Sequence, residues 1–169
     1  MELTEAILTR RSVRHFSDVP VDETDVEKIL RAGMQAPSAN NSQPWRFVVI
    51  TQREKLDAIP EFHPYAQMMR EATLAILVCA YVPEGKLFDL WVQDCSAATQ
   101  NMLLTCHALG LGAVWLGIHP RSERTEPLRE LFGLPAEIKP VTLMAVGHPA
   151  EKPQPVDRFD QTKVHYNRW

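Results

Sequence analysis

Apolar residues recur along the chain at the spacings of helices and strands, and their order predicts an α+β protein. Helices are predicted over residues 3–10, 23–36, 86–109 and 125–132, and strands over residues 45–51, 73–82, 112–118 and 141–147. The run from Thr73 to Val82 is almost wholly apolar, which is typical of a buried central strand. About four strands with helices between them are therefore expected in one domain over residues 1–169.

The predicted helices differ in their apolar side chains, in the residues at their ends and in their small residues. The first carries Leu3, Ile7 and Leu8 at helical spacing, and the second has Asp22 as its N-cap and stops before Pro37. The inward side chains expected for the second helix are Val26, Ile29, Leu30 and Met34. The third is the longest, and Gly110 suits the left-handed position after it. Small residues at 96–98 would let another helix or a flat ligand come close, although core packing explains them equally well.

Composition and charge narrow the class of protein. The 169 residues are 45% hydrophobic and 23% charged, which is ordinary for a globular chain with one core. The net charge of −3 argues against a nucleic-acid-binding protein. No apolar run approaches the roughly 20 residues of a membrane span, and the start lacks a signal-peptide pattern, so a cytoplasmic location is expected. Cys79, Cys95 and Cys106 are interpreted as buried apolar residues rather than disulfide or zinc ligands.

The last stretch of the chain, residues 148–169, differs from everything before it. It contains three proline breaks and no apolar period, and yet it ends with Tyr166 and Trp169. Such a tail is unable to build a core of its own. We therefore expect it to lie on another surface, such as that of a partner subunit.

The first group of residues with candidate chemistry is Arg10, Arg11, Ser12 and Arg14 at the end of the first helix. Guanidinium groups bind phosphate oxygens through paired, charge-assisted hydrogen bonds, and a serine hydroxyl takes a further oxygen. This composition indicates a phosphate clamp. The alternative is that the basic residues complement the helix dipole and point into water.

The second group is the loop over residues 37–44, with the sequence PSANNSQP. Its amide side chains both donate and accept hydrogen bonds, which suits the C=O and N–H groups along the pyrimidine edge of a flavin. Loops of this composition are also ordinary turns, because Ser and Asn side chains bond their own backbone.

The third group is the glycine-rich run over residues 109–117. It is not a dinucleotide fingerprint, since Trp115 stands where that pattern needs its third glycine. Gly117 at a strand end indicates either a close approach of ligand to backbone or a bulge. No phosphate-binding P-loop, zinc-protease motif or nucleophile elbow occurs, and the six histidines lack metal-ligand spacing. An enzyme without reactive side chains of its own usually uses a cofactor.

Five segments in the same order resemble the FMN-dependent nitroreductase family from end to end: RRSVRHF, APSANNSQPWRFVVI, DCSAATQNMLLTCHALGLGAVWLG, VTLMAVGHPAEKP and RFDQTKVHYNRW. The resemblance implies an α+β fold with a mixed, mostly antiparallel sheet flanked by helices. It further implies a homodimer, with the long central helix at the dimer interface and two FMN sites shared between the subunits.

The resemblance also assigns residues to FMN. The phosphate would be held by Arg10, Arg11 and Ser12, with Arg14 close by and Arg158 completing the clamp. The loop would reach the flavin ring from the other subunit through Pro37, Ser38 and Ala39, with Asn41 and Gln43 as polar neighbours. The backbone of Leu116 and Gly117 would lie near flavin N5. No catalytic side chain and no metal ligand is assigned.

The implied activity is an NAD(P)H-dependent oxidoreductase with ping-pong kinetics. NADH or NADPH would give hydride to flavin N5 and leave, and an electron-poor acceptor such as a nitroaromatic or a quinone would take its place. Two alternatives stay open: a non-redox flavin- or nucleotide-binding protein, and a flavoenzyme with other chemistry, such as oxidation or dehalogenation. Because few residues separate Val82 from the long helix, an open acceptor site is expected, with Tyr65, Phe88 and Trp91 as candidate lining residues.

Overall fold

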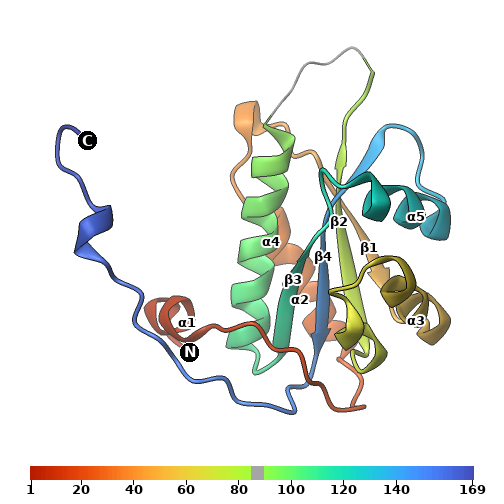
Figure 1. Ribbon diagram of the computed structural model, residues 1–169, viewed down its shortest axis with the longest axis horizontal. Helices are drawn as coiled ribbons and strands as arrows, with labels where there is room; N and C mark the ends of the chain where they lie inside the picture. The colour runs from red at the N-terminus through yellow and green to blue at the C-terminus, as the bar shows by residue number, and fades with distance from the viewer. Residues whose placement is uncertain (85–89) are drawn as a thin grey trace.

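A four-stranded sheet forms the centre of the computed structural model, which describes residues 1–84 and 90–169 (Figure 1). The strands are β1 (Trp45–Ile50), β2 (Leu74–Tyr81), β3 (Gly112–Gly117) and β4 (Ile138–Gly147), in the order β1-β2-β4-β3. All three neighbouring pairs are antiparallel. The expected sheet was mixed and mostly antiparallel, and the parallel contribution is an isolated bridge between Ser12 and Ala113.

Helices cover both faces of the sheet (Figure 1). The helices α2 (Glu23–Met34) and α4 (Trp91–Ala108) lie on one face, and α3 (Arg53–Phe62) and α5 (Ser122–Phe132) lie on the other. Successive strand residues point to opposite faces, so Ile76 and Met144 pack toward α2 and α4 while Leu77 and Leu143 pack toward α3 and α5. The predicted buried central strand is confirmed, because residues 74–80 of β2 are all buried.

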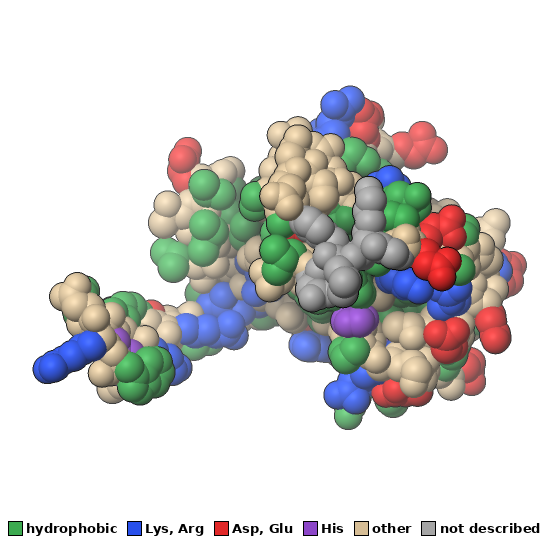
Figure 2. All heavy atoms as spheres, turned by 90° about the horizontal axis from the view of Figure 1, so that it is seen from above, with side chains coloured by type: hydrophobic (Ala, Val, Ile, Leu, Met, Phe, Trp, Pro, Cys, Tyr) green, Lys and Arg blue, Asp and Glu red, His purple; other side chains and the backbone are tan. Residues whose placement is uncertain are grey.

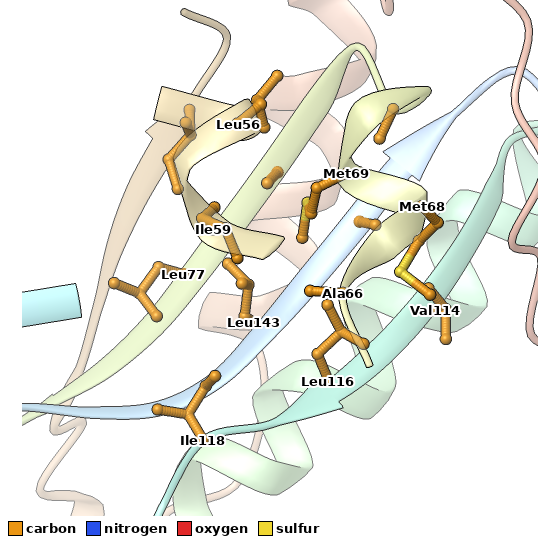
Figure 3. Close-up of a cluster of buried hydrophobic side chains, with 14 of the residues drawn as sticks. Leu56, Ile59, Ala66, Met68, Met69, Leu77, Val114, Leu116, Ile118 and Leu143 are labelled. Atoms are coloured by element: carbon orange, nitrogen blue, oxygen red, sulfur yellow. The ribbon is translucent and has the colours of Figure 1, made fainter. Parts of the chain in front are cut away.

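The segment between β1 and β2 contains structure that the apolar pattern did not predict. Residues 52–72 form α3 and the short 3-10 helix η2 (Gln67–Arg70). Figure 3 shows Leu56 and Ile59 of α3 facing the same cluster as Met69 of η2. Pro60 lies inside α3, where a proline argues against a helix in the sequence because it removes a backbone hydrogen-bond donor.

Several predicted boundaries shift in the structure. The helix expected from residue 86 begins at Trp91 among the described residues, and residues 85–89, with the candidate Phe88, lie outside them. The helix expected from residue 125 starts at Ser122, and the last strand starts at Ile138 instead of residue 141. Gly110 adopts the predicted positive φ of 79°. Met34 was expected inward and is exposed at the last position of α2, whose buried residues are Ile29 and Gly33.

Apolar side chains near both ends of the chain are exposed to solvent. In α1 (Leu3–Thr9) only Ala6 is buried, and Leu3, Ile7 and Leu8 are exposed. The tail passes α1 and then projects away from the body as an arm (Figure 1), and Figure 2 shows basic and apolar side chains along it. Phe159, Tyr166 and Trp169 are all exposed there.

All three cysteines are buried and unpaired, as predicted, and burial raises the pKa of each thiol to about 12. Such thiols are inert at neutral pH, since the thiolate is the reactive form. Within residues 1–84 and 90–169, no helix combines the length and apolar character that crossing a membrane requires.

Candidate functional site

Three of the predicted clamp arginines, Arg10, Arg11 and Arg158, lie close together where α1 ends and the tail passes. Burial lowers the pKa of Arg10, and the nearby positive charges of Arg11 and Arg158 lower it further. Within the described part of the chain, none of these arginines forms an ion pair with a carboxylate. Like charges this close repel one another, so the cluster is arranged to receive an anion.

Arg11 differs from the other clamp residues in its hydrogen bonds. Its guanidinium donates to the carbonyls of Leu8 and Arg10, at 3.1 and 2.6 Å, and to that of Val156 at 2.8 Å. It therefore joins the end of α1 to the tail. Arg10, Arg14 and Arg158 have no such side-chain partner among the residues that the structure describes, which leaves their donors available to a ligand.

Ser12 and Arg14 follow on a segment that is attached to the open edge of β3. Ser12 bridges Ala113 in parallel, and the Val13 N–H donates to the Ala113 carbonyl at 3.0 Å. On the other side of this segment the Glu151 carboxylate accepts from the Arg14 N–H at 2.6 Å and from the His15 N–H at 3.3 Å. The bond from Arg14 is the main cause of the lowered pKa of Glu151.

The edge of β3 beyond Ala113 is open. Backbone polar groups alternate between the two sides of a strand, so Trp115 and Gly117 present their N–H and C=O groups to the same edge as Ala113. A hollow of about 420 Å³ lies here, lined by Arg14, residues 114–117, His63, Tyr65 and Arg124. Gly117 is exposed, and a Cβ built on it meets no atom within 4 Å. Among residues 1–84 and 90–169, no contact requires glycine at this position.

Two residues that the sequence analysis did not assign to the site converge on Gly117. Its carbonyl accepts a hydrogen bond from Arg124 Nη1 at 2.7 Å and contacts His63 Nε2 at 3.3 Å. Both side chains are buried. Nothing in the neighbours of His63 along the chain indicates a meeting with Arg124, which lies 61 positions later.

The loop over residues 37–44 is held at the other end of α4. The buried Asp94 carboxylate accepts from the Ala39 N–H at 3.1 Å and from the Ser42 hydroxyl at 3.4 Å. Within the loop, the Gln43 N–H donates to Ser38 Oγ at 3.0 Å, and its side-chain amide donates to Asn41 Oδ1 at 2.9 Å.

The backbone of this loop is strained. Asn41 and Gln43 adopt φ values of 52° and 46°, in the left-handed region that glycine favours and glutamine rarely enters. Such conformations persist only where surrounding contacts enforce them, and they occur often at functional sites. Pro37 and Asn41 are exposed at the surface of the loop, while Ser38 and Ala39 are half-buried.

The loop over residues 37–44 and the arginine clamp at the end of α1 lie far apart within one chain. Asp94 lies in the first turn of α4, while Thr9, next to the clamp, contacts His107 in the last turn at 2.8 Å. At 1.5 Å per residue these positions are about 20 Å apart along the helix. Residues 37–44 do not line the hollow at β3. Ser42 and Gln43 line a separate hollow of about 400 Å³, together with Tyr81 and the candidate Trp91.

The basic cluster and the open strand edge suit a flat ligand that carries a phosphate, bound at the rim of an α+β sheet. The chain belongs to the nitroreductase family: the family model described as "Nitroreductase family" matches residues 7–64 and 60–148. The resemblance noted from the five sequence segments is thereby confirmed.

Individual relatives are similar over nearly the whole chain. A protein from Methanothermobacter thermautotrophicus named "Putative NADH dehydrogenase/NAD(P)H nitroreductase" is 46% identical, over 100% of this chain and 88% of its own length. The crystal structure of a protein of the same name from Parabacteroides distasonis superposes with a TM-score of 0.94 at 40% identity, covering 99% of this chain and 98% of that one. A structure from Desulfovibrio desulfuricans in complex with FMN has a TM-score of 0.84 at 34% identity, covering 100% and 98%. The predicted α+β nitroreductase-like fold is confirmed.

Proposed function

We propose that this protein is an FMN-dependent NAD(P)H oxidoreductase that works as a homodimer. The observation that carries the proposal is the cluster of Arg10, Arg11 and Arg158 beside an open strand edge that ends in an unobstructed glycine. The FMN complex of the Desulfovibrio desulfuricans protein and the nicotinamide in the name of the Methanothermobacter relative support the same chemistry.

The residues present fit the phosphate of FMN. A phosphate monoester carries about two negative charges, which the unpaired guanidinium groups of Arg10, Arg14 and Arg158 would match, together with the Ser12 hydroxyl. Arg11 would act differently from the other three, because its donors already bind carbonyls. Its task would be to hold the tail against α1 so that Arg158 reaches the phosphate.

The open edge of β3 fits the flavin ring. The free N–H groups of Trp115 and Gly117 would donate to acceptor atoms on the ring, and the absent side chain of Gly117 leaves room for a flat group to approach the backbone. Leu116 contributes its buried side chain to the core beneath this edge. The ring face turned away from the protein would stay open for a substrate.

A homodimer accounts for the features that one chain leaves incomplete. The loop over residues 37–44 lies too far from the clamp to reach the same ring, so Pro37, Ser38, Ala39, Asn41 and Gln43 would approach it from the partner subunit. The exposed apolar residues of α1 and of the tail over residues 148–169 would pack on the partner. The α4 helix, which spans the distance between loop and clamp, would lie in the interface.

FMN, when bound, supplies the hydride chemistry: it takes hydride from NADH or NADPH and gives it to an electron-poor acceptor such as a nitroaromatic or a quinone. The chain binds the phosphate, orients the ring and offers one open hollow in which nicotinamide and acceptor bind in turn. That shared space is the basis for expecting ping-pong kinetics. Tyr65, exposed at the rim of the hollow, is positioned to contact either substrate.

The purified protein tests this proposal directly. We expect a yellow protein that light scattering measures at about twice the 19.2 kDa chain mass, with initial rates that give parallel double-reciprocal lines for NAD(P)H and a quinone. A monomer that retains FMN would contradict the shared site. Flavin that neither nicotinamide reduces would indicate a non-redox binding protein, and reducible flavin without turnover would indicate another flavin chemistry. The cytoplasmic location stays a prediction from the sequence.

A further inference from the structure

The Gly117 carbonyl has an unusual set of partners for an exposed strand end. Arg124 is 9% exposed and His63 is 1% exposed, and both direct a nitrogen at this one oxygen. Water would satisfy the carbonyl of an exposed residue at little cost. Instead, two polar side chains from separate elements, α5 and the end of α3, are buried to reach it.

Burial of these two groups is expensive. Arg124 has no carboxylate partner among the described residues, and its Nε is buried without a hydrogen bond. His63 Nδ1 is buried without a partner as well. Buried charges are normally paired, and unpaired polar atoms cost free energy. The two side chains thus meet at the strand edge at a cost in free energy, and a role at this edge would account for that cost.

Tyr65 contacts both members of the pair from the solvent side. Its ring lies 5.6 Å from the Arg124 guanidinium carbon, in a cation–π contact, and meets the His63 ring edge-on at 6.4 Å. Burial lowers the pKa of His63, and the Arg124 charge lowers it further. In the tautomer that carries its proton on Nε2, His63 donates to the Gly117 carbonyl beside Arg124.

We propose that Arg124, supported by His63, is a positioning residue that sets the redox preference of the flavin site. It would hold the Gly117 carbonyl so that the N–H of the same residue stays directed at the ligand. It would also keep an unneutralised positive charge beside the ring. This inference rests on the proposed function, because it takes the open edge of β3 as the place where the ring binds.

The expected consequence is tighter binding of reduced than of oxidised FMN. Reduction adds negative charge to the ring system, and a charge in a poorly solvated position acts on it strongly, with little screening by water. Removing the charge should therefore weaken binding of the reduced form more than that of the oxidised form. A residue with a merely structural role would weaken both forms equally and leave the midpoint potential unchanged.

The test is the midpoint potential of bound FMN in Arg124→Gln, Arg124→Lys and Arg124→Met, with Arg121→Gln as the matched control. Arg121 is an exposed arginine at the start of the same helix. In Arg124→Gln and Arg124→Met, we expect the ratio of affinities for reduced and oxidised FMN to fall at least tenfold. For a two-electron couple, this fall shifts the midpoint potential of bound FMN by about 30 mV to more negative values. Lys should restore most of the loss, and Arg121→Gln should match the wild type.

Arg124→Met provides a second variant in case Arg124→Gln misfolds. The methionine side chain fills a similar volume to that of arginine and adds no polar atom that would need a hydrogen-bond partner. Thermal unfolding of the apo variants gives a readout independent of FMN. Unchanged potentials in Arg124→Gln and Arg124→Met, in a protein whose wild type binds reducible FMN, would overturn this inference and leave the proposed function intact. A wild type that does not bind FMN would overturn both.

Discussion

Replacing Gly117 by alanine should affect folding and cofactor binding in opposite directions. A Cβ at this position meets no atom within 4 Å, and Gly117 is not among the glycines with positive φ, so the folded chain accepts the methyl group without strain. Alanine also loses less backbone entropy than glycine on folding. The apo protein should gain about 0.5–1 kcal/mol in free energy of unfolding.

The same methyl group would occupy the space that we assign to the flavin ring. Forcing an extra methyl into a filled contact costs about 1–3 kcal/mol, so the dissociation constant for FMN should rise by about 5- to 150-fold. Urea unfolding of the apo protein measures the first effect, and quenching of FMN fluorescence on titration measures the second.

Gly112→Ala is the matched control on the same strand. A Cβ there would lie 2.6 Å from Cγ1 of Val13, so this variant should lose about 1–3 kcal/mol in free energy of unfolding. Gly117 does not face the flavin if Gly117→Ala binds FMN as tightly as the wild type, and the position is not free of contacts if Gly117→Ala destabilises the apo protein as much as Gly112→Ala does.

Three further predictions concern the clamp and its supports. Arg10→Ala and Arg158→Ala should each weaken FMN binding by about 10- to 150-fold in fluorescence titrations, since charge-assisted hydrogen bonds contribute about 1.5–3 kcal/mol. Arg11→Ala should free the tail and speed its cleavage in limited proteolysis, because Arg11 holds the Val156 carbonyl. Glu151→Gln should lower the melting temperature at neutral pH. Because the pKa of Glu151 is lower in the folded chain than in the unfolded one, its charged carboxylate stabilises the fold at pH values above the ordinary carboxyl pKa. This stabilisation is lost as the pH falls through the lowered pKa of the folded chain.

Each of these predictions has an outcome that would contradict it. Arg70, an exposed arginine paired with Glu61, provides the control for the clamp, and Arg70→Ala should leave FMN affinity unchanged. Equal affinity in Arg10→Ala and Arg158→Ala would remove the phosphate assignment. A cleavage rate in Arg11→Ala equal to that of the wild type would show that the tail is held elsewhere. A Glu151→Gln deficit that persists at acid pH would exclude the charged carboxylate as its cause.

The parts of the fold that the sequence predicted are those with an uninterrupted local pattern. Strand β2 was predicted from its uninterrupted apolar run, and α4 from apolar and small residues at helical spacing that end at Gly110. Helix α3 was missed because Pro60 interrupts its pattern, and only packing on the sheet explains why the helix forms there. The inward direction of Met34 was wrong: it is the last residue of α2 and is exposed, and local spacing does not tell how far along a helix its neighbours extend.

The residues of the candidate site also differ in whether a local sequence pattern predicts them. Arg10, Arg11 and Ser12 are adjacent in the chain, so their chemistry was visible as a motif, and Arg158 was assigned only through the family resemblance. His63 and Arg124 come from distant elements and meet at one carbonyl, which no local pattern records. Arg11 was predicted as a phosphate ligand, while its hydrogen bonds to three carbonyls could be found only from the folded backbone.

Anaerobic titration of the FMN-loaded protein with NADH and with NADPH shows whether a nicotinamide reduces the bound flavin. The flavin absorbance should bleach with one equivalent of nicotinamide per 19.2 kDa chain, and addition of a quinone should restore it in full. A flavin spectrum that stays unchanged with an excess of both nicotinamides would contradict the account.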